Sequence, residues 1–236
     1  HEGIILNPDF VFDIQVKRLH EYKRQQLNAM NIIADYNYLL QNPDADFVPK
    51  TYIFASKAAP GYYIAKQIIK MIWCIGEELK HNPKLSEKLS VVFLEDYRVT
   101  LSEILMPAAE ISEQISLAGT EASGTGNMKL MLNGALTLGT YDGANVEIHE
   151  AVGTDNIFIF GMRTPEVNEL RMKGYHPEDY INNSQVIRDV MQRMYNGING
   201  ATFEEVANSI RNKDFYMALA DFDSYRGTQH YISEVY

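Results

Sequence analysis

Short apolar stretches alternate with longer stretches of helical periodicity along most of this chain, and this alternation constrains the fold more than any other feature. Strands buried on both faces of a sheet are short and apolar, and helices show apolar residues three or four positions apart. Strands that alternate with helices imply right-handed βαβ crossovers. We therefore predict an α/β fold with a doubly wound, mostly parallel sheet.

The predicted elements follow from this pattern and from its stop signals. The expected strands are 11–16, 51–55, 91–94, 115–118, 135–140 and 156–160. Helices are expected from about Leu27 to Asn42, from Ile64 to Asn82, from near Asn127, and at 165–172, 184–196, 202–211 and 214–221. Asn-Pro pairs end the first two helices. No repeat or flexible linker interrupts the sequence, so residues 1–236 are interpreted as one domain.

Composition narrows the functional class. The formal net charge of −10 argues against a general binder of nucleic acid or of an anionic membrane. The single cysteine, Cys74, lies in an apolar run and is predicted to be buried, so we expect a reducing, cytoplasmic location. No apolar stretch reaches the ~18 residues of a membrane span. The histidines lack neighbouring Cys or His ligands at metal spacing, so no metal site is predicted.

A cluster of basic residues follows the first predicted strand. Its members are Lys17, Arg18, His20, Lys23 and Arg24. In a parallel sheet, ligands bind beyond the carboxyl ends of the strands, where the N–H groups that open the next helix favour anions. Arg offers phosphate a bidentate fork and Lys a mobile charge. The cluster therefore indicates a phosphate site, and the alternative is the solvated basic face of a surface helix.

A second segment, residues 121–129, combines glycines with a lysine. The loop 123–126 can turn several backbone N–H groups towards a phosphate, and Lys129 falls just inside a predicted helix. A lysine that is partly desolvated near other cations has a lowered pKa and can form a Schiff base. The segment is neither a Walker loop nor a dinucleotide fingerprint, because Met128 precedes Lys129 and Lys129 replaces the last glycine of G-x-G-x-x-G. By itself, a turn with a surface lysine explains it equally well.

Taken together, the two segments resemble the glycogen, starch and maltodextrin phosphorylase family. Residues 15–25 are similar to the phosphate-site segment of that family and residues 121–129 to its cofactor-lysine segment. Further similar stretches are 56–62, 94–99 and 133–145. The resemblance implies a glycosyltransferase-B architecture, in which two Rossmann-like domains enclose the active site. Residues 1–236 resemble its second, C-terminal domain, and we expect the N-terminal domain and the extreme C-terminus to be absent.

The resemblance also implies a role for individual residues. Pyridoxal 5′-phosphate would be bound as a Schiff base to Lys129, with its ring beside Tyr97. The expected contacts of its phosphate group are Lys17, Thr125 and Gly126. The expected contacts of the substrate phosphate are Arg18, Lys23 and Gly124, and those of the glucose hydroxyls are Glu121, Ala122 and Ser123. The residues expected to be catalytic are Lys17, Arg18 and Lys23.

The implied reaction is the phosphorolysis of α-1,4-glucan by phosphate to give glucose 1-phosphate. Two adjacent phosphate groups need several cations and N–H donors to offset their repulsion, and the two segments supply such a set. The full-length protein is expected to be a homodimer that binds neither nucleic acid nor membrane. The chain alone is expected to be inactive and to expose apolar surface where the other domain packs. A nucleotide-sugar glycosyltransferase without the cofactor and a non-catalytic binding module remain alternatives.

Overall fold

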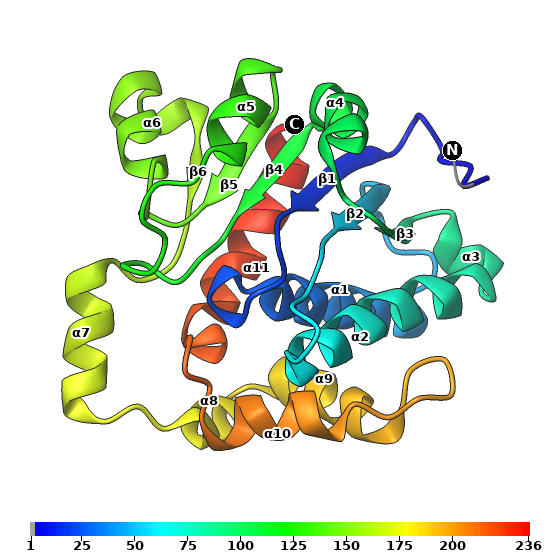
Figure 1. Cartoon of the computed structure of the whole chain (residues 1–236). Coiled ribbons are helices and arrows are strands. Elements are labelled where there is room, and N and C mark those ends of the chain that lie inside the picture. Colours follow the sequence, from blue (N-terminus) through cyan, green and yellow to red (C-terminus); the bar gives the residue numbers. More distant parts are fainter. Residues whose placement is uncertain (1–2) are drawn as a thin grey trace.

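The computed structural model describes residues 3–236 as one parallel sheet between layers of helices (Figure 1). The strand order is β3-β2-β1-β4-β5-β6, and all neighbouring strands are parallel. The strands are β1 (Val11–Val16), β2 (Lys50–Ala55), β3 (Leu89–Leu94), β4 (Ile111–Gln114), β5 (Leu136–Gly139) and β6 (Phe158–Ile159). The order reverses between β1 and β4, because the chain winds outward first in one direction and then in the other. This topology confirms the predicted doubly wound, Rossmann-like fold.

Helices cover both faces of the sheet, and two apolar cores lie between the layers. On one face, α4 (Val99–Ala108) and α5 (Gly126–Leu132) pack over Ile14 and Ile53, and α6 (Asn145–Val152) lies beside them in Figure 1. The larger core on the other face joins the sheet to α1, α2 and α11. The helices on that side are α1 (Gln25–Gln41), α2 (Tyr63–Lys80), α3 (Pro83–Ser86), α8 (Pro177–Asn183), α9 (Gln185–Asn196), α10 (Glu204–Asn212) and α11 (Ala218–Val235). The helix α7 (Thr164–Lys173) and the short helices η1 (Glu21–Lys23) and η2 (Thr154–Asn156) complete the described elements.

Most predicted elements are confirmed, but the strand expected at 115–118 is wrong. The fourth strand is β4, which ends at Gln114, and residues 115–118 form a buried loop beyond its carboxyl end. The polar residues within β4 hid it from the apolar pattern. The sequence did not predict α3, α4, α6 and α8. The helix predicted at 214–221 begins only at Ala218 and continues to Val235.

An acidic stretch such as Asp214–Asp223 is typical of a solvated helix and turn, but two of its carboxylates are buried. Asp214 is buried and accepts hydrogen bonds from the backbone N–H groups of Ala218 and Leu219, at 3.0 and 2.9 Å. It therefore fixes the start of α11. Asp221 is also buried, 1% exposed, and lies on the inner face of α11.

Strand β1 alternates apolar and polar residues, yet neither of its faces is exposed to solvent. Asp13 and Gln15 point away from the Ile14 side of the sheet and are each 1% exposed. The helix α11 covers them and supplies Gln229, whose Nε2 donates to Asp13 Oδ2 at 3.0 Å and to Glu113 Oε1 at 2.6 Å. The polar alternation of β1 therefore reflects a buried hydrogen-bonded layer under α11.

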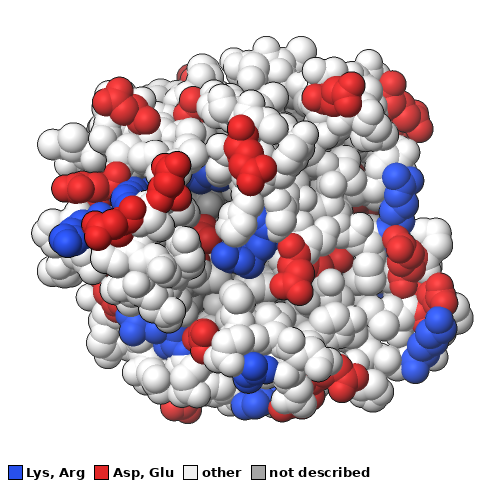
Figure 2. Space-filling view, turned by 180° about the vertical axis from the view of Figure 1, so that it is seen from behind, with Lys and Arg blue, Asp and Glu red and all other residues white. Residues whose placement is uncertain are grey.

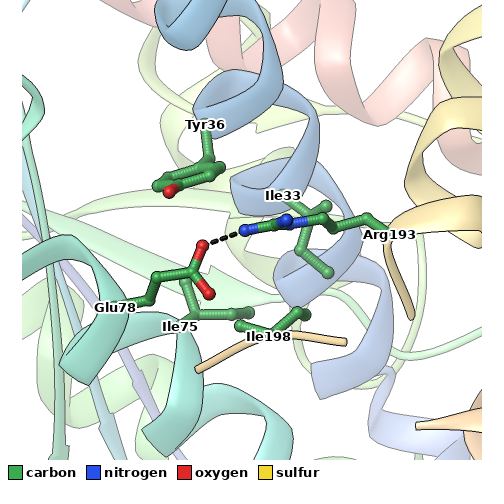
Figure 3. A pocket seen from close by; sticks show the side chains of 6 residues that line it. All are labelled: Ile33, Tyr36, Ile75, Glu78, Arg193 and Ile198. Carbon is green, nitrogen blue, oxygen red and sulfur yellow. Dashed lines mark hydrogen bonds and ion pairs between the residues drawn. The ribbon is translucent and has the colours of Figure 1, made fainter. Parts of the chain in front are cut away.

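A polar contact also joins α1, α2 and α9 within the outer helical layer (Figure 3). The Arg193 guanidinium of α9 forms an ion pair with Glu78 of α2 and lies 5.3 Å from the Tyr36 ring centroid of α1. Figure 3 shows the two charged groups pointing towards each other beside that ring. The cavity that they line holds about 10 Å³. That volume is at the lower limit for a single water molecule, so this pocket is a packing feature.

Charges on the surface are mixed. Figure 2 shows acidic and basic side chains interspersed over the rear face, so the net charge of −10 is not gathered into one patch in that view. Cys74 is buried in α2, as predicted. Within residues 3–236, no helix combines the length and hydrophobicity that crossing a membrane requires.

Gly76 sets the distance between α2 and β3. A Cβ at this position would lie 2.4 Å from the carbonyl oxygen of Val91, so a larger residue must push the helix off the strand. We expect Gly76→Ala to lower the free energy of unfolding by about 1–3 kcal/mol. The matched control is Gly227→Ala in α11, where a Cβ meets nothing within 4 Å. The free energy of unfolding of that variant should rise by about 0.5–1 kcal/mol. Urea titrations measure both, and equal effects would contradict the close approach at Gly76.

Candidate functional site

Two of the loops predicted to carry function meet where the strand order reverses. Lys17 directly follows β1, and the loop 115–125 follows β4. Because β1 and β4 are neighbouring parallel strands, their carboxyl ends lie at the same edge of the sheet. The backbone N–H of Leu117 donates to the Tyr22 carbonyl at 3.1 Å and joins the two loops. In doubly wound folds, ligands bind in the crevice at this position.

A direct ion pair links these two loops. The Lys23 ammonium lies 3.3 Å from Glu121 Oε2, and both side chains are largely shielded from solvent, at 18% and 15% exposure. The Lys23 nitrogen also lies 5.2 Å from the centroid of the Tyr22 ring. The structure therefore brings together a residue expected to bind phosphate and one expected to bind a sugar hydroxyl.

Lys17 is half-buried beside this pair, and its ionisation is strongly affected by the position. Burial, reinforced by the neighbouring Lys23 ammonium, lowers the pKa of Lys17 to about 8, although the Glu121 and Asp142 carboxylates oppose the change. A lysine of this kind exists in both protonation states slightly above neutral pH. It can bind an anion as a cation and can also take up or release a proton.

Arg24 does not belong to the phosphate cluster in which the sequence placed it. Its side chain is fully buried, and its guanidinium forms an ion pair with Asp221 at 2.7 Å. The same group donates to the carbonyl of Ile115 at 2.8 Å and more weakly to those of Ser116 and Tyr216. The basic residue thus joins the loop after β4 to α11. The sequence reading failed here because a run of basic residues does not show which side chain turns inward.

The glycine-rich segment forms an exposed loop and the start of α5. Thr125 immediately precedes α5, and a Cβ at Gly126 would meet nothing within 4 Å, so the backbone there is open to an approaching group. Lys129 lies one turn into α5 and is exposed. The partial desolvation that the sequence reading assigned to Lys129 is found at Lys17 instead.

The remaining predicted residues surround these two centres. Arg18 is exposed, as are Ala122 and Ser123, and Gly124 is half-buried. Tyr97 packs against the apolar cluster that contains Leu130 of α5, so it stands on the same side of the sheet as the Lys129 helix. The structure thus places Lys17, Arg18 and Lys23 after β1, Tyr97 after β3, and the segment 121–129 after β4.

The loop between β5 and α6 supports the site, and the sequence reading assigned no role to it. The Ala144 N–H donates to the Ser123 carbonyl at 2.8 Å, and a Cβ at Gly143 would lie 2.6 Å from that carbonyl oxygen. Asp142 in the same loop is buried and accepts hydrogen bonds from the loop that follows β4. The Asp-Gly pair that precedes a helix was an available turn signal.

Apolar side chains are exposed on the helices next to the predicted cofactor lysine. Val99 and Ile104 of α4 are 73% and 55% exposed, and Met128 and Leu132 of α5 are 40% and 88% exposed. The two helices contact each other and stand on the same side of the sheet in Figure 1. An exposed apolar surface was expected from the sequence, and large patches of this kind are typical of interaction surfaces.

Comparisons with known proteins all point to one family. The family described as "Carbohydrate phosphorylase" matches residues 1–236. The chain is 49% identical to "Glycogen phosphorylase" of Pasteurella multocida and 48% identical to "Glycogen phosphorylase, muscle form" of Bos taurus, over 99% and 98% of its residues. It is 45% identical to "Glycogen phosphorylase, brain form" of Ovis aries over 99% of its residues. The chain spans 28–29% of the length of these relatives.

Proposed function

Because the chain belongs to the carbohydrate phosphorylase family, we propose that it forms the cofactor- and phosphate-binding part of a glycogen phosphorylase. The proposed reaction is the phosphorolysis of α-1,4-glucan to glucose 1-phosphate, a hexosyl transfer that depends on pyridoxal 5′-phosphate. The observation that carries the proposal is the meeting of Lys17, Lys23 and Glu121 at the point where the strand order reverses.

The residues at the site fit a phosphate-bearing cofactor. Two ammonium groups, Lys17 and Lys23, lie close enough for each to influence the other electrostatically. Like charges held together in this way are stabilised when an anion binds between them. The backbone around Gly126 is sterically open, and the exposed Lys129 amine is accessible for covalent attachment. Tyr97 can then cover a ring held near α5.

When bound, the cofactor supplies a phosphate group that acts as an acid/base partner of the substrate phosphate. Lys17 balances the charge of the cofactor phosphate together with the open backbone at Thr125 and Gly126. Lys23, Arg18 and Gly124 bind the substrate phosphate. The Lys23 ammonium has three donors, so it can bind the anion while it keeps its contact with Glu121. The Glu121 carboxylate, held in place by that contact, can also accept from a glucose hydroxyl, next to Ala122 and Ser123, and this orients the sugar.

The proposed partners are therefore α-1,4-glucan, phosphate and glucose 1-phosphate, in a cytoplasmic protein whose full-length form is a homodimer. We further propose that residues 1–236 act as the C-terminal Rossmann-like domain of this architecture and that the exposed apolar face of α4 and α5 packs against the other domain. Two observations support this proposal. The chain spans only part of the length of its relatives, and the Val99 and Leu132 side chains are exposed. Without that domain, the chain is expected to turn over no glucan.

The proposal predicts covalent attachment of the cofactor to one lysine. After incubation with pyridoxal 5′-phosphate and reduction with borohydride, peptide mass mapping should find the pyridoxyl group on Lys129. Lys129→Arg should abolish the labelling because it keeps the charge and lacks the reactive amine. The matched control is Lys66→Arg on the exposed side of α2, which should label like the wild type. Labelling of another lysine in the wild type, or of none, would contradict the assignment.

The same experiment separates the proposal from its alternatives. A nucleotide-sugar glycosyltransferase with this fold has no use for a reactive lysine in the loop after β4, so it would show no cofactor absorbance and would transfer from a sugar nucleotide. A binding module without catalysis would bind glucan or phosphate and leave Lys129 unlabelled.

A further inference from the structure

The carboxylate of Asp142 accepts three hydrogen bonds from the loop that follows β4. The backbone N–H of Gly119 donates to Oδ1 at 2.9 Å, and that of Glu121 donates to Oδ2 at 2.9 Å. The Ser116 hydroxyl donates to Oδ2 at 2.8 Å. Asp142 is 6% exposed, so these bonds are largely shielded from water. A single carboxylate from the β5–α6 loop thus holds both ends of residues 116–121.

We infer that Asp142 is a positioning residue of the proposed phosphate site, because its carboxylate fixes the path of residues 116–121 and so places the Glu121 side chain against Lys23. The contacts are continuous: Asp142 Oδ2 holds the Glu121 N–H, and Glu121 Oε2 lies 3.3 Å from the Lys23 ammonium. The inference rests on the proposed function, since it names phosphate as the anion that Lys23 and Lys17 receive.

Because Asp142 is negatively charged, its role can be tested by whether its replacement strengthens or weakens phosphate binding. A buried carboxylate close to an anion site repels the anion, so removing only its charge should strengthen phosphate binding. Its hydrogen bonds act in the opposite direction, because they hold the loop in the form that the site uses. Charge-assisted hydrogen bonds to backbone N–H groups are strong, and unpaired N–H groups in a buried position are costly. If Asp142 positions the loop, the loss of its hydrogen bonds must weaken phosphate binding more than the loss of its charge strengthens it.

Asp142 also acts on Lys17 through its charge. Its carboxylate opposes the effect of burial on Lys17, so it favours the charged form of that lysine. The protonation of Lys17 therefore provides a readout that a purely structural contact elsewhere in the loop would not change.

The first experiment compares the affinity of the purified chain for inorganic phosphate by titration calorimetry, at a pH well below the Lys17 pKa of about 8, so that this lysine is charged in both proteins. Asp142→Asn removes the charge and cannot accept all three hydrogen bonds, because its amide group would face a backbone N–H. We expect the affinity to fall by about tenfold or more, although a negative charge has been removed. The matched control is Glu147→Gln on the exposed side of α6, which removes an equal charge and should bind phosphate like the wild type. Affinity in Asp142→Asn equal to or tighter than that of the wild type would overturn the inference.

The second experiment follows the acylation rate of the Lys17 amine against pH by peptide mass mapping. In Asp142→Asn the midpoint of this profile should move below the wild-type pKa of about 8. Ser116→Ala keeps the charge and loses one hydrogen bond, so it should weaken phosphate binding and leave the Lys17 profile unchanged. If Asp142→Asn fails to fold, wild-type phosphate affinity in Ser116→Ala overturns the inference.

The two experiments distinguish failure of the inference from failure of the proposed function. No phosphate binding by the wild-type chain counts against the proposed function. Because the inference rests on the proposed function, that outcome overturns both, whereas phosphate binding by the wild type with equal or tighter affinity in Asp142→Asn overturns the inference alone.

Discussion

Arg24→Met should be one of the most destabilising single substitutions in this protein, lowering the free energy of unfolding by about 3–5 kcal/mol. The substitution would leave the Asp221 carboxylate, which is 1% exposed, without the guanidinium that now lies 2.7 Å from it. The carbonyls of Ile115 and Ser116 would lose a donor as well. Urea-induced unfolding followed by circular dichroism measures the effect.

Two further variants test whether the loss of the buried ion pair causes this destabilisation. Arg18→Met removes the same type of residue from an exposed position in the same segment and should change stability by less than about 0.5 kcal/mol. Adding Asp221→Asn to Arg24→Met removes the unpaired charge and should restore part of the loss. Equal effects of Arg24→Met and Arg18→Met would show that the buried ion pair contributes nothing to stability.

The second large effect is a pH dependence that arises beneath α11. Asp13 of β1 and Glu113 of β4 are both buried, and among residues 3–236 neither Asp13 Oδ1 nor Glu113 Oε2 has a hydrogen-bond donor. Burial raises the pKa of Glu113 well above 4.5, and the Asp13 carboxylate adds to the rise. Burial also raises the pKa of Asp13, although Lys50 opposes it. We infer that the two oxygens share a proton, which gives each of them a hydrogen-bond partner.

This shared proton determines how stability depends on pH. Above pH 4.5, the unfolded chain releases the Glu113 proton, whereas the folded protein keeps it. The free energy of unfolding should therefore fall as the pH rises from 4.5 towards the raised pKa of Glu113 in the folded protein. Glu113→Gln replaces the protonated group: its oxygen can still accept from Tyr225 and Gln229, and its amide can donate to Asp13. The variant should therefore become more stable than the wild type, by up to about 1.4 kcal/mol for each pH unit above that point.

The measurement is a series of urea titrations from pH 4.5 upward. Glu103→Gln on the exposed side of α4 is the matched control, and its stability relative to the wild type should not vary with pH. A difference between Glu113→Gln and the wild type that is constant across the series would exclude the shared proton.

The sequence predicted the fold class because its apolar strands and their stop signals are local features. It predicted only the first turn of α11, because the inner face of the rest carries Gln229 and Tyr225 in place of a clear apolar stripe. Those polar side chains are buried only because β1 and β4 present Asp13 and Glu113 to them. Such pairing is a tertiary property, and no window of the sequence contains both partners.

The candidate site shows the same division between local and tertiary information. The segments that hold Lys17 and Lys129 were found from their residue types and their position after strands. Whether a particular basic side chain faces the ligand or the core was not encoded locally, so Arg24 was placed wrongly. Asp142 was missed because a lone aspartate before a glycine predicts only a turn, whereas its three bonds to residues 116–121 arise from the neighbouring positions of β4 and β5.

The reversal of strand order between β1 and β4 also bears on how the protein is made. Lys23 and Glu121 are 98 positions apart, and Arg24 reaches Asp221 across 197 positions. Contacts of such long range form slowly, since the loops between them must close first. During synthesis, the basic segment leaves the ribosome long before its acidic partners exist. The loops that hold Lys23 and Arg24 therefore cannot reach their final arrangement until the chain has been synthesised as far as Asp221.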